Sequence, residues 1–199
     1  MPFLLLYRRS IRIFGELEGG FILASKDKNK NAREWIIVII IVAAVFFVLR
    51  GGVFRSIEVK GVSMEDTLEH GDLVFINRWL RLDRGDIVVY KNTKGEHIIK
   101  RVIGIPGDVV DIQFNGAYDD VYLNGEMLDE DDFIKETMYQ KGDMDYPVTV
   151  PEGEYFLMGD NRNVSNDSRQ KENGTISKDK ILGQVIGRVY PFSKFGKVK

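Results

Sequence analysis

The chain has 199 residues, of which 44% are hydrophobic and 29% are charged, which is typical of a folded globular protein. Its formal net charge of −2 provides no basic field, so we expect no nucleic-acid partner. The absence of cysteine excludes disulfides, thiol nucleophiles and cysteine-ligated zinc, and two histidines are too few for a histidine-only metal site, so no metal or cofactor is expected.

The N-terminal part contains one long apolar run. Residues 35–49 are fifteen consecutive apolar residues, which as a helix cover only about 22 Å of a ~30 Å hydrocarbon core. Extension to residue 54, with Arg50 reaching towards the interface, brings the run to spanning length. A buried core helix and a cleaved signal peptide are the alternatives. The run is apolar on every face and no small-x-small cleavage site follows it, which favours an uncleaved transmembrane anchor at 35–54.

Flanking charge predicts how this anchor is oriented. Basic residues crowd its N-terminal side, at Lys26, Lys28, Lys30 and Arg33. The positive-inside rule then keeps residues 1–34 in the cytoplasm as an N-terminal extension, either a small amphipathic helix on the membrane or a frayed end. The same rule places residues 55–199 outside the cytoplasm. We therefore expect a single-pass plasma-membrane protein with an extracytoplasmic domain.

The pattern after the anchor is predominantly β. Short apolar runs alternate with Gly-Asp and Asn-Gly turn signals every eight to twelve residues, which predicts a mainly β, antiparallel sheet or barrel-like fold. The expected strands are 57–60, 73–76, 87–90, 97–103, 109–114, 121–123, 155–158 and 181–190.

Residues 117–147 differ from the rest of this domain because they are strongly acidic. A calcium site built from clustered carboxylates is one interpretation, but the spacing of an EF-hand loop is missing. We interpret the segment as a solvated lobe or insertion.

Ser63 is the first candidate for chemistry. It follows the alternating run 57–60 and lies in a glycine-flanked turn, where a serine is well placed to present its hydroxyl. Most serines in such turns only cap or solvate them. A catalytic role therefore requires a base from elsewhere in the chain.

Lys100 is the candidate base. If residues 97–103 form a strand, the period of two places Lys100 on one face together with Ile98 and Val102. Desolvation by these apolar neighbours lowers the pKa of a lysine, and a lowered pKa allows the amine to act as a general base. The alternative is an edge strand from which Lys100 reaches into solvent.

Residues 159–169 form a dense polar loop after the apolar run 155–158. Asp, Asn, Arg and Ser at the exit of a strand are common turn residues. They are also the side chains that position a catalytic pair through hydrogen bonds and ion pairs. The balance of two aspartates and two arginines favours a self-satisfied network over an anion site.

These stretches, in this order behind an apolar span, resemble the type I signal peptidases. The family's Ser-Met-x-Pro-Thr-Leu box corresponds to residues 63–68, and its Arg-Gly-Asp-Ile-Val-Val box to residues 84–89. The Lys-Arg-Val-Ile-Gly-x-Pro-Gly-Asp box is complete at 100–108, and the Gly-Asp-Asn-Arg-x-x-Ser-x-Asp-Ser-Arg box at 159–169. The resemblance covers residues 35–192.

The resemblance implies a β-rich signal-peptidase fold with one N-terminal transmembrane helix. It also implies a membrane serine endopeptidase that removes signal peptides from exported preproteins, with Ser63 as nucleophile and Lys100 as general base. The backbone N–H of Ser63 would supply one oxyanion donor. Some members carry a second donor, a serine hydroxyl, two residues earlier; Gly61 occupies that position here, so another group must serve.

Further roles follow from the same resemblance. Ser165 would hydrogen-bond to the lysine and orient it, and Met64 would pack beneath the nucleophile. The expected supporting ion pairs are Asp160 with Arg101 and Asp167 with Arg169. The acidic segment 117–147 corresponds to the region where family members vary most in length.

One residue departs from the family pattern. Asp66 occupies the position of the proline in the first box, where proline would stiffen the turn. Aspartate can hold a similar turn through its own backbone, but it adds a charge near the substrate cleft. Asp66 is also the one feature that favours the alternative function, a catalytically silent membrane-anchored binding protein of the same fold. A self-cleaving Ser/Lys protein of the repressor type is disfavoured by the apolar span.

Overall fold

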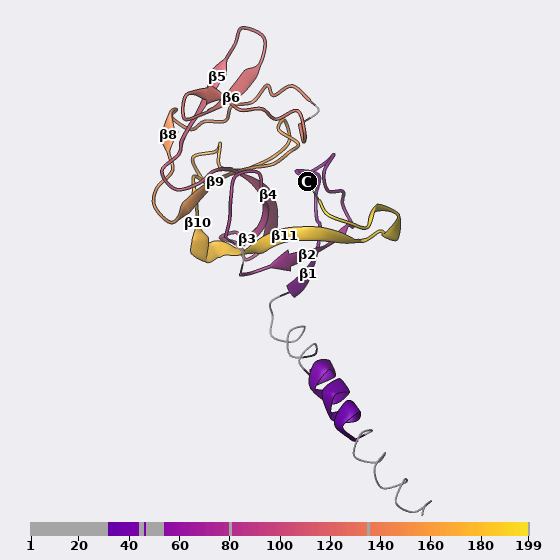
Figure 1. Ribbon diagram of the computed structural model, residues 1–199. Coiled ribbons are helices and arrows are strands. Elements are labelled where there is room, and N and C mark those ends of the chain that lie inside the picture. The colour runs from indigo at the N-terminus through magenta and orange to yellow at the C-terminus, as the bar shows by residue number, and fades with distance from the viewer. Residues whose placement is uncertain (1–31, 44–45, 47–53, 80, 135, 199) are drawn as a thin grey trace, which may run out of the picture. The chain divides into compact units, whose positions relative to one another are not determined.

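The computed structural model describes residues 32–43, 46, 54–79, 81–134 and 136–198 (Figure 1). Residues 32–43 form a helix whose large apolar side chains, from Trp35 to Val42, are exposed. Among the residues that are described, no helix is long and apolar enough to cross a membrane. Residues 1–31 of the predicted extension, and 44–45 and 47–53 of the predicted anchor, lie outside the described residues.

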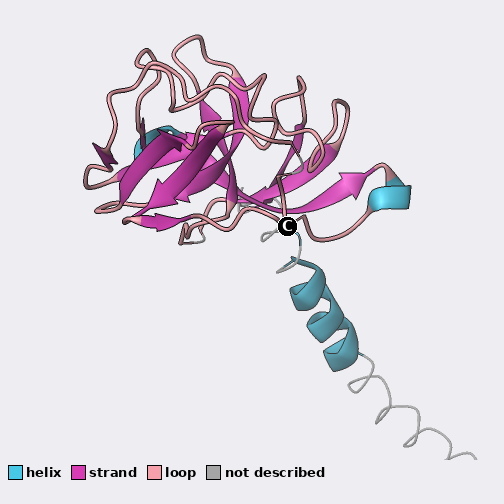
Figure 2. Ribbon diagram, turned by 90° about the horizontal axis from the view of Figure 1, so that it is seen from above, coloured by secondary structure: helices cyan, strands magenta, loops and turns pink. Residues whose placement is uncertain are grey.

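A seven-stranded antiparallel sheet forms the larger part of the β domain, in the order β1-β2-β11-β3-β4-β9-β10 (Figures 1 and 2). The strand β11 is the longest and pairs with both β2 and β3, with irregularities in register that bend it. The strands are β1 (Phe54–Glu58), β2 (Leu73–Asn77), β3 (Ile87–Lys91), β4 (His97–Gly104), β9 (Glu154–Met158), β10 (Ile176–Ser177) and β11 (Ile181–Tyr190).

A second antiparallel sheet has four strands in the order β7-β6-β5-β8. Its strands are β5 (Val109–Phe114), β6 (Asp119–Leu123), β7 (Glu126–Met127) and β8 (Val148–Thr149). The predicted Asn-Gly turn joins β6 to β7, with positive φ at both Asn124 (56°) and Gly125 (87°). That conformation suits the two-residue hairpin loop that the sequence indicated.

The core follows from strand alternation. In β2, Val74 and Ile76 are fully buried whereas Phe75 between them is 41% exposed, as a period of two requires. Buried side chains of β1, β2, β3 and β4 form one cluster on the large sheet, and Ile103, Phe156 and Met158 form another with the small sheet. The predicted mainly β, antiparallel architecture is confirmed.

The acidic segment 117–147 is only partly solvated. It contains β6, the buried side chains of Asp119 and Met138, and Glu130, which forms an ion pair with the buried Arg162. Its role is therefore partly structural, and it contacts the polar loop that follows β9.

Candidate active site

Ser63 lies in the connection between β1 and β2, in a turn that the core holds. Met64, the next residue, is 2% exposed, and Leu68 is fully buried; both belong to the cluster on the large sheet. The N–H groups of Thr67 and Leu68 donate to the Met64 carbonyl at 2.9 and 2.7 Å and close the turn. Ser63 itself stays partly exposed. The turn thus presents the hydroxyl at the surface while the side chain of Met64 is buried in the core.

Lys100 reaches this hydroxyl from β4. Its Nζ donates to Ser63 Oγ at 2.7 Å, although the two residues are 37 positions apart in the chain. Lys100 is 2% exposed and pairs in register with Val88 of β3. The edge-strand alternative is wrong, because β4 lies between β3 and β9 in the interior of the sheet.

The surroundings of Lys100 change its proton affinity. Burial lowers the pKa of Lys100 from its ordinary value of 10.5 to about 8, and the negative charge of Asp167 opposes this shift only in part. A substantial fraction of the amine is therefore neutral in mildly alkaline solution. A neutral amine 2.7 Å from a hydroxyl can accept its proton, which is the chemistry of a general base.

The loop after β9 holds the turn that carries Ser63. The Asn161 N–H donates to the Ser63 carbonyl at 3.1 Å, and the Asn161 side chain donates to the Val62 carbonyl at 3.1 Å. The Thr67 hydroxyl donates to Asp160 Oδ2 at 2.6 Å. Two of these hydrogen bonds join the first and fourth sequence boxes, and the third joins the fourth box to Val62, the residue just before the first. No local pattern in the sequence indicates these contacts.

Gly159 permits the close approach of these two loops. A Cβ atom at this position would lie 2.5 Å from the Ser63 carbonyl oxygen and 2.3 Å from Ser165 Oγ, so a larger residue would displace one of them. Only glycine fits at this position because of these close contacts. Its backbone N–H also donates a hydrogen bond to Asp167 at 2.9 Å.

The predicted ion pair between Arg101 and Asp160 is present and buried. Arg101 Nε and Nη2 donate to Asp160 Oδ1 and Oδ2 at 2.8 and 2.6 Å, and Nη1 donates to the Gly85 carbonyl at 2.8 Å. The ring of Phe133 covers the guanidinium at 4.1 Å. Because Asp160 also accepts from Thr67, this pair fixes one end of the Ser63 turn.

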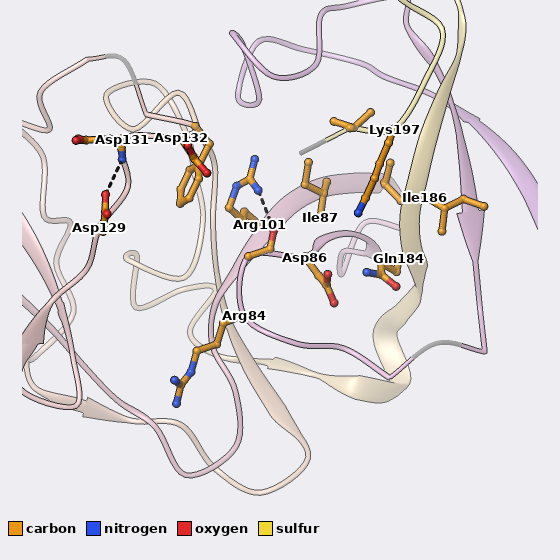
Figure 3. A pocket seen from close by; sticks show the side chains of 14 residues that line it. Arg84, Asp86, Ile87, Arg101, Asp129, Asp131, Asp132, Gln184, Ile186 and Lys197 are labelled. Carbon is orange, nitrogen blue, oxygen red and sulfur yellow. Dashed lines mark hydrogen bonds between the residues drawn. The ribbon is translucent and has the colours of Figure 1, made fainter.

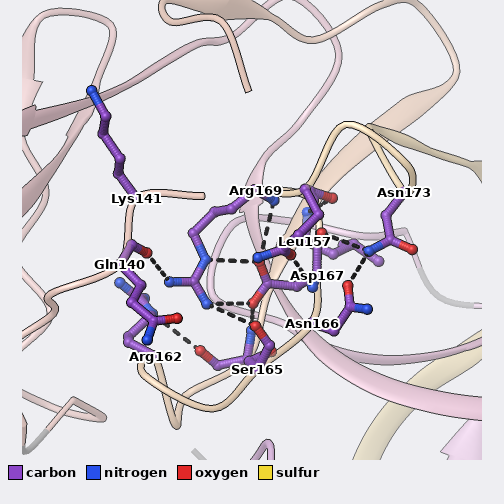
Figure 4. Close-up of polar contacts among 12 residues, drawn as sticks. Gln140, Lys141, Leu157, Arg162, Ser165, Asn166, Asp167, Arg169 and Asn173 are labelled. Atoms are coloured by element: carbon purple, nitrogen blue, oxygen red, sulfur yellow. Dashed lines mark hydrogen bonds and ion pairs between the residues drawn. The ribbon is translucent and has the colours of Figure 1, made fainter. Parts of the chain in front are cut away.

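Asp167 and Arg169 form the second predicted pair (Figure 4). Arg169 Nε and Nη2 donate to Asp167 at 2.8 and 2.9 Å, and Arg169 Nη1 donates to the Gln140 carbonyl at 2.7 Å. Burial opposes ionisation of Asp167, but the Arg169 guanidinium and the Gly159 N–H together hold its pKa below the ordinary value. Asp167 is therefore charged near neutral pH and contributes to the potential at Lys100.

The hydrogen bond expected between Ser165 and Lys100 is not formed. Ser165 is buried, and its Oγ has no hydrogen-bond partner within the described part of the chain. It lies close enough to Asp167 to help to lower the pKa of that carboxyl. The Lys100 amine is instead directed at Ser63. A role for Ser165 in orienting the lysine stays a prediction.

Arg162 is the member of the loop whose partner the sequence did not indicate. Its guanidinium forms a two-point ion pair with Glu130, and its Nε donates to the Gly159 carbonyl at 3.1 Å. The balance of charges in the sequence could have indicated that Arg162 has a distant partner. Counting Arg101, the site holds three arginines against the two aspartates of the loop, so the third arginine required a carboxylate from elsewhere.

Two hollows lie beside β4. A cleft of about 200 Å³ is lined by Ser63, Lys100, Ile98 and Ile99 among others. A larger pocket of about 680 Å³ borders Arg101, with Arg84, Asp86 and Lys197 around it (Figure 3). Lys100 and Ser63 line only the smaller one, so size does not locate the chemistry. The described residues contain no group of three or more His, Cys, Asp or Glu that is arranged to hold a metal ion.

Comparison with known proteins places this geometry in a family. A family model described as "Signal peptidase, peptidase S26" matches residues 32–190. Signal peptidase I S of Bacillus subtilis (strain 168) is 36% identical over 182 residues, which cover 86% of this chain and 96% of the relative. Signal peptidase IB of Staphylococcus aureus (strain N315) is 34% identical over 185 residues, which cover 84% and 94%.

A solved signal peptidase I from Enterococcus faecalis V583 is 29% identical, with a TM-score of 0.40 over 53% of this chain and 97% of that one. The family model extends from the helix at residues 32–43 through the whole seven-stranded sheet, and it includes all four sequence boxes. With relatives above 30% identity along nearly their whole length, the chain belongs to the signal peptidase family, peptidase S26.

Proposed function

We propose that this chain is a membrane-anchored serine endopeptidase that removes signal peptides from exported preproteins, with Ser63 as nucleophile and Lys100 as general base. Family membership supports the activity. The observation that carries the residue assignment is the 2.7 Å contact between Lys100 Nζ and Ser63 Oγ, made by a buried lysine whose pKa is lowered to about 8.

The proposed reaction uses this contact twice. Neutral Lys100 accepts the proton of the Ser63 hydroxyl as Oγ attacks the scissile carbonyl carbon, and the carbonyl oxygen becomes an oxyanion. The Ser63 N–H donates to that oxyanion. The protonated lysine then gives its proton to the leaving amine, which departs and leaves an ester on Ser63. Water, deprotonated by Lys100, hydrolyses the ester and regenerates both groups.

The proposed substrate is an extended preprotein segment. The cleft at Ser63 shares Lys60, Gly61 and Ile98 with a groove of about 730 Å³ that runs along β1 and the start of β4. Such a groove suits a peptide in extended conformation. The small volume of the cleft, about 200 Å³, favours small side chains next to the cleaved bond, as the family resemblance implies.

The proposed membrane attachment is a single anchor at residues 35–54. In its support, the helix at 32–43 exposes a continuous series of large apolar side chains from Trp35 to Val42, and the basic residues come before Trp35 in the sequence. In this proposal residues 1–34 are a cytoplasmic extension and residues 55–199 an extracytoplasmic catalytic domain, with the lipid bilayer as a permanent partner.

Cleavage of a preprotein by the full chain in detergent tests the proposed function. We expect release of the signal peptide at one junction, and a loss of kcat/KM of about 10⁴-fold or more in Ser63→Ala, because the nucleophile is removed. Ser177→Ala, in the two-residue strand β10, is the matched control and should keep full activity. The silent-binder alternative predicts that the unmodified chain binds a preprotein without cutting it.

A further inference from the structure

Asn161 is distinguished by contacts to two consecutive peptide units around the proposed nucleophile. Its side-chain amide donates to the Val62 carbonyl and its backbone N–H donates to the Ser63 carbonyl, each at 3.1 Å. We propose that Asn161 is a positioning residue that sets the direction of the oxyanion-binding N–H of Ser63. This inference rests on the proposed role of Ser63.

The geometry of the peptide bond couples the Val62 carbonyl to the Ser63 N–H. The Val62 carbonyl and the Ser63 N–H belong to one planar trans peptide unit, so they point in opposite directions. The Val62 carbonyl accepts from the Asn161 amide and from the Glu65 N–H, each at 3.1 Å, and these hydrogen bonds also fix the line along which the Ser63 N–H points. Polarisation of the carbonyl by the amide donor further strengthens the N–H as a donor.

The Ser63 N–H itself is available for substrate. Within the part of the chain that the structure describes, it donates to no acceptor, whereas the N–H groups of Glu65, Thr67 and Leu68 later in the turn are paired. Gly61 offers no hydroxyl as a second donor. Stabilisation of an oxyanion then depends more heavily on this one N–H, and on whatever keeps it aligned.

Asn161 is well anchored for such a role. Its own carbonyl accepts from the N–H groups of Val164 and Ser165 at 3.3 and 3.0 Å, which closes a tight turn. Its chain neighbours Asp160 and Arg162 are both buried in two-point ion pairs. The Asn161 amide is thus held from both sides while it holds the Val62–Ser63 unit.

The test compares Asn161→Ala and Asn161→Asp with Asn163→Ala in the full chain. Deleting a direct oxyanion donor lowers kcat by about 10²–10³-fold; misaligning one should lower kcat by about 10- to 100-fold, with KM unchanged. Asn161→Asp keeps the shape of the side chain but removes its donor at the pH of assay, so it should match or exceed Asn161→Ala. Asn163 lies two residues away and its side chain bonds to Thr137 and Tyr139 rather than to the Ser63 turn, so its variant should keep kcat.

Two further readings separate alignment from general damage. A peptidyl boronic acid, which forms a tetrahedral adduct with a serine, should bind the Asn161 variants more weakly by the same factor as kcat/KM falls. In Asn161→Ala the acid limb of the pH profile should not move, because this substitution changes no charge near Lys100. A kcat within twofold of the parent, an equal loss in Asn163→Ala, or a loss confined to KM would overturn the inference. Cleavage by Ser63→Ala would instead overturn the proposed function.

Discussion

Lys100→Met abolishes signal-peptide cleavage in the full chain, lowering kcat/KM by about 10⁴-fold or more, while the β domain stays folded. Methionine fills a similar volume but cannot accept the proton of the Ser63 hydroxyl, which the amine of Lys100 contacts at 2.7 Å. Lys100→Arg should be equally inactive, because a guanidinium remains protonated at every pH of assay. Steady-state cleavage of a preprotein measures both.

Lys100→Met should also stabilise the fold near neutral pH. Below about pH 8, Lys100 is charged in the folded and the unfolded chain, and the full cost of burying that charge is present. The cost is relieved as pH rises from about 8 to 10.5, and this gap corresponds to roughly 3 kcal/mol at most. Urea unfolding at pH 7 should therefore show Lys100→Met to be more stable than the parent, and the difference should shrink at pH 10.

The exposed Lys91, at the end of β3, provides a matched control. Lys91→Met removes the same charge from an adjacent strand and should change neither cleavage nor the pH dependence of stability. A Lys100→Met variant that still cleaves preprotein at the parental rate would show that another group is the base.

Arg101→Met has the second large effect, here on stability. It leaves the carboxylate of Asp160 buried without its ion-pair partner, which costs about 3–5 kcal/mol of the free energy of unfolding. Cleavage should fall as well, because Asp160 holds the hydroxyl of Thr67 in the turn that carries Ser63. Chemical denaturation of the full chain in detergent, followed by circular dichroism, measures the first effect.

The exposed ion pair between Arg81 and Asp83, whose side chains are 88% and 68% exposed, is the matched control. Arg81→Met should change the free energy of unfolding by no more than about 1 kcal/mol. Adding Asp160→Asn to Arg101→Met removes the uncompensated charge and should recover part of the loss. A single Arg101→Met variant as stable as the parent would mean that the pair does not support the fold.

Several features of the site were predictable because they depend on local pattern. The period of two placed Lys100 among apolar neighbours on one face of its strand, and Arg101 on the other. The same period could not show whether the strand is interior or at an edge. That depends on the pairing of β4 with β3 and β9, which no local pattern encodes. Likewise β7, β8 and β10 contain two residues each, which is too short for any periodicity.

Contacts between distant segments were the part that local pattern could not provide. Glu130 lies 32 positions before Arg162, and nothing in the acidic segment singles it out from its neighbours. The pairing of Asn161 with Val62 joins residues 99 positions apart. Both depend on how the loop after β9 folds over the turn between β1 and β2.

Asp66 replaces the family proline in the turn after Ser63, and the structure shows what holds that turn. The family proline would stiffen this turn through its ring. Here the turn is closed by the Met64 carbonyl, which accepts from Thr67 and Leu68, and is tied to Asp160 through the Thr67 hydroxyl. These hydrogen bonds supply rigidity next to Ser63, so the replacement does not by itself favour a silent protein.

The rate at which a serine-directed acylating inhibitor modifies Ser63, followed as a function of pH, tests the proposed Ser63–Lys100 pair most directly. We expect one adduct, located on Ser63 by peptide mass mapping, whose rate of formation rises tenfold per pH unit on the acid side and levels off near pH 8. An adduct on another residue, or a rate that levels off near pH 6.5, about the pKa of an ordinary histidine, would contradict the assignment of Ser63 and Lys100.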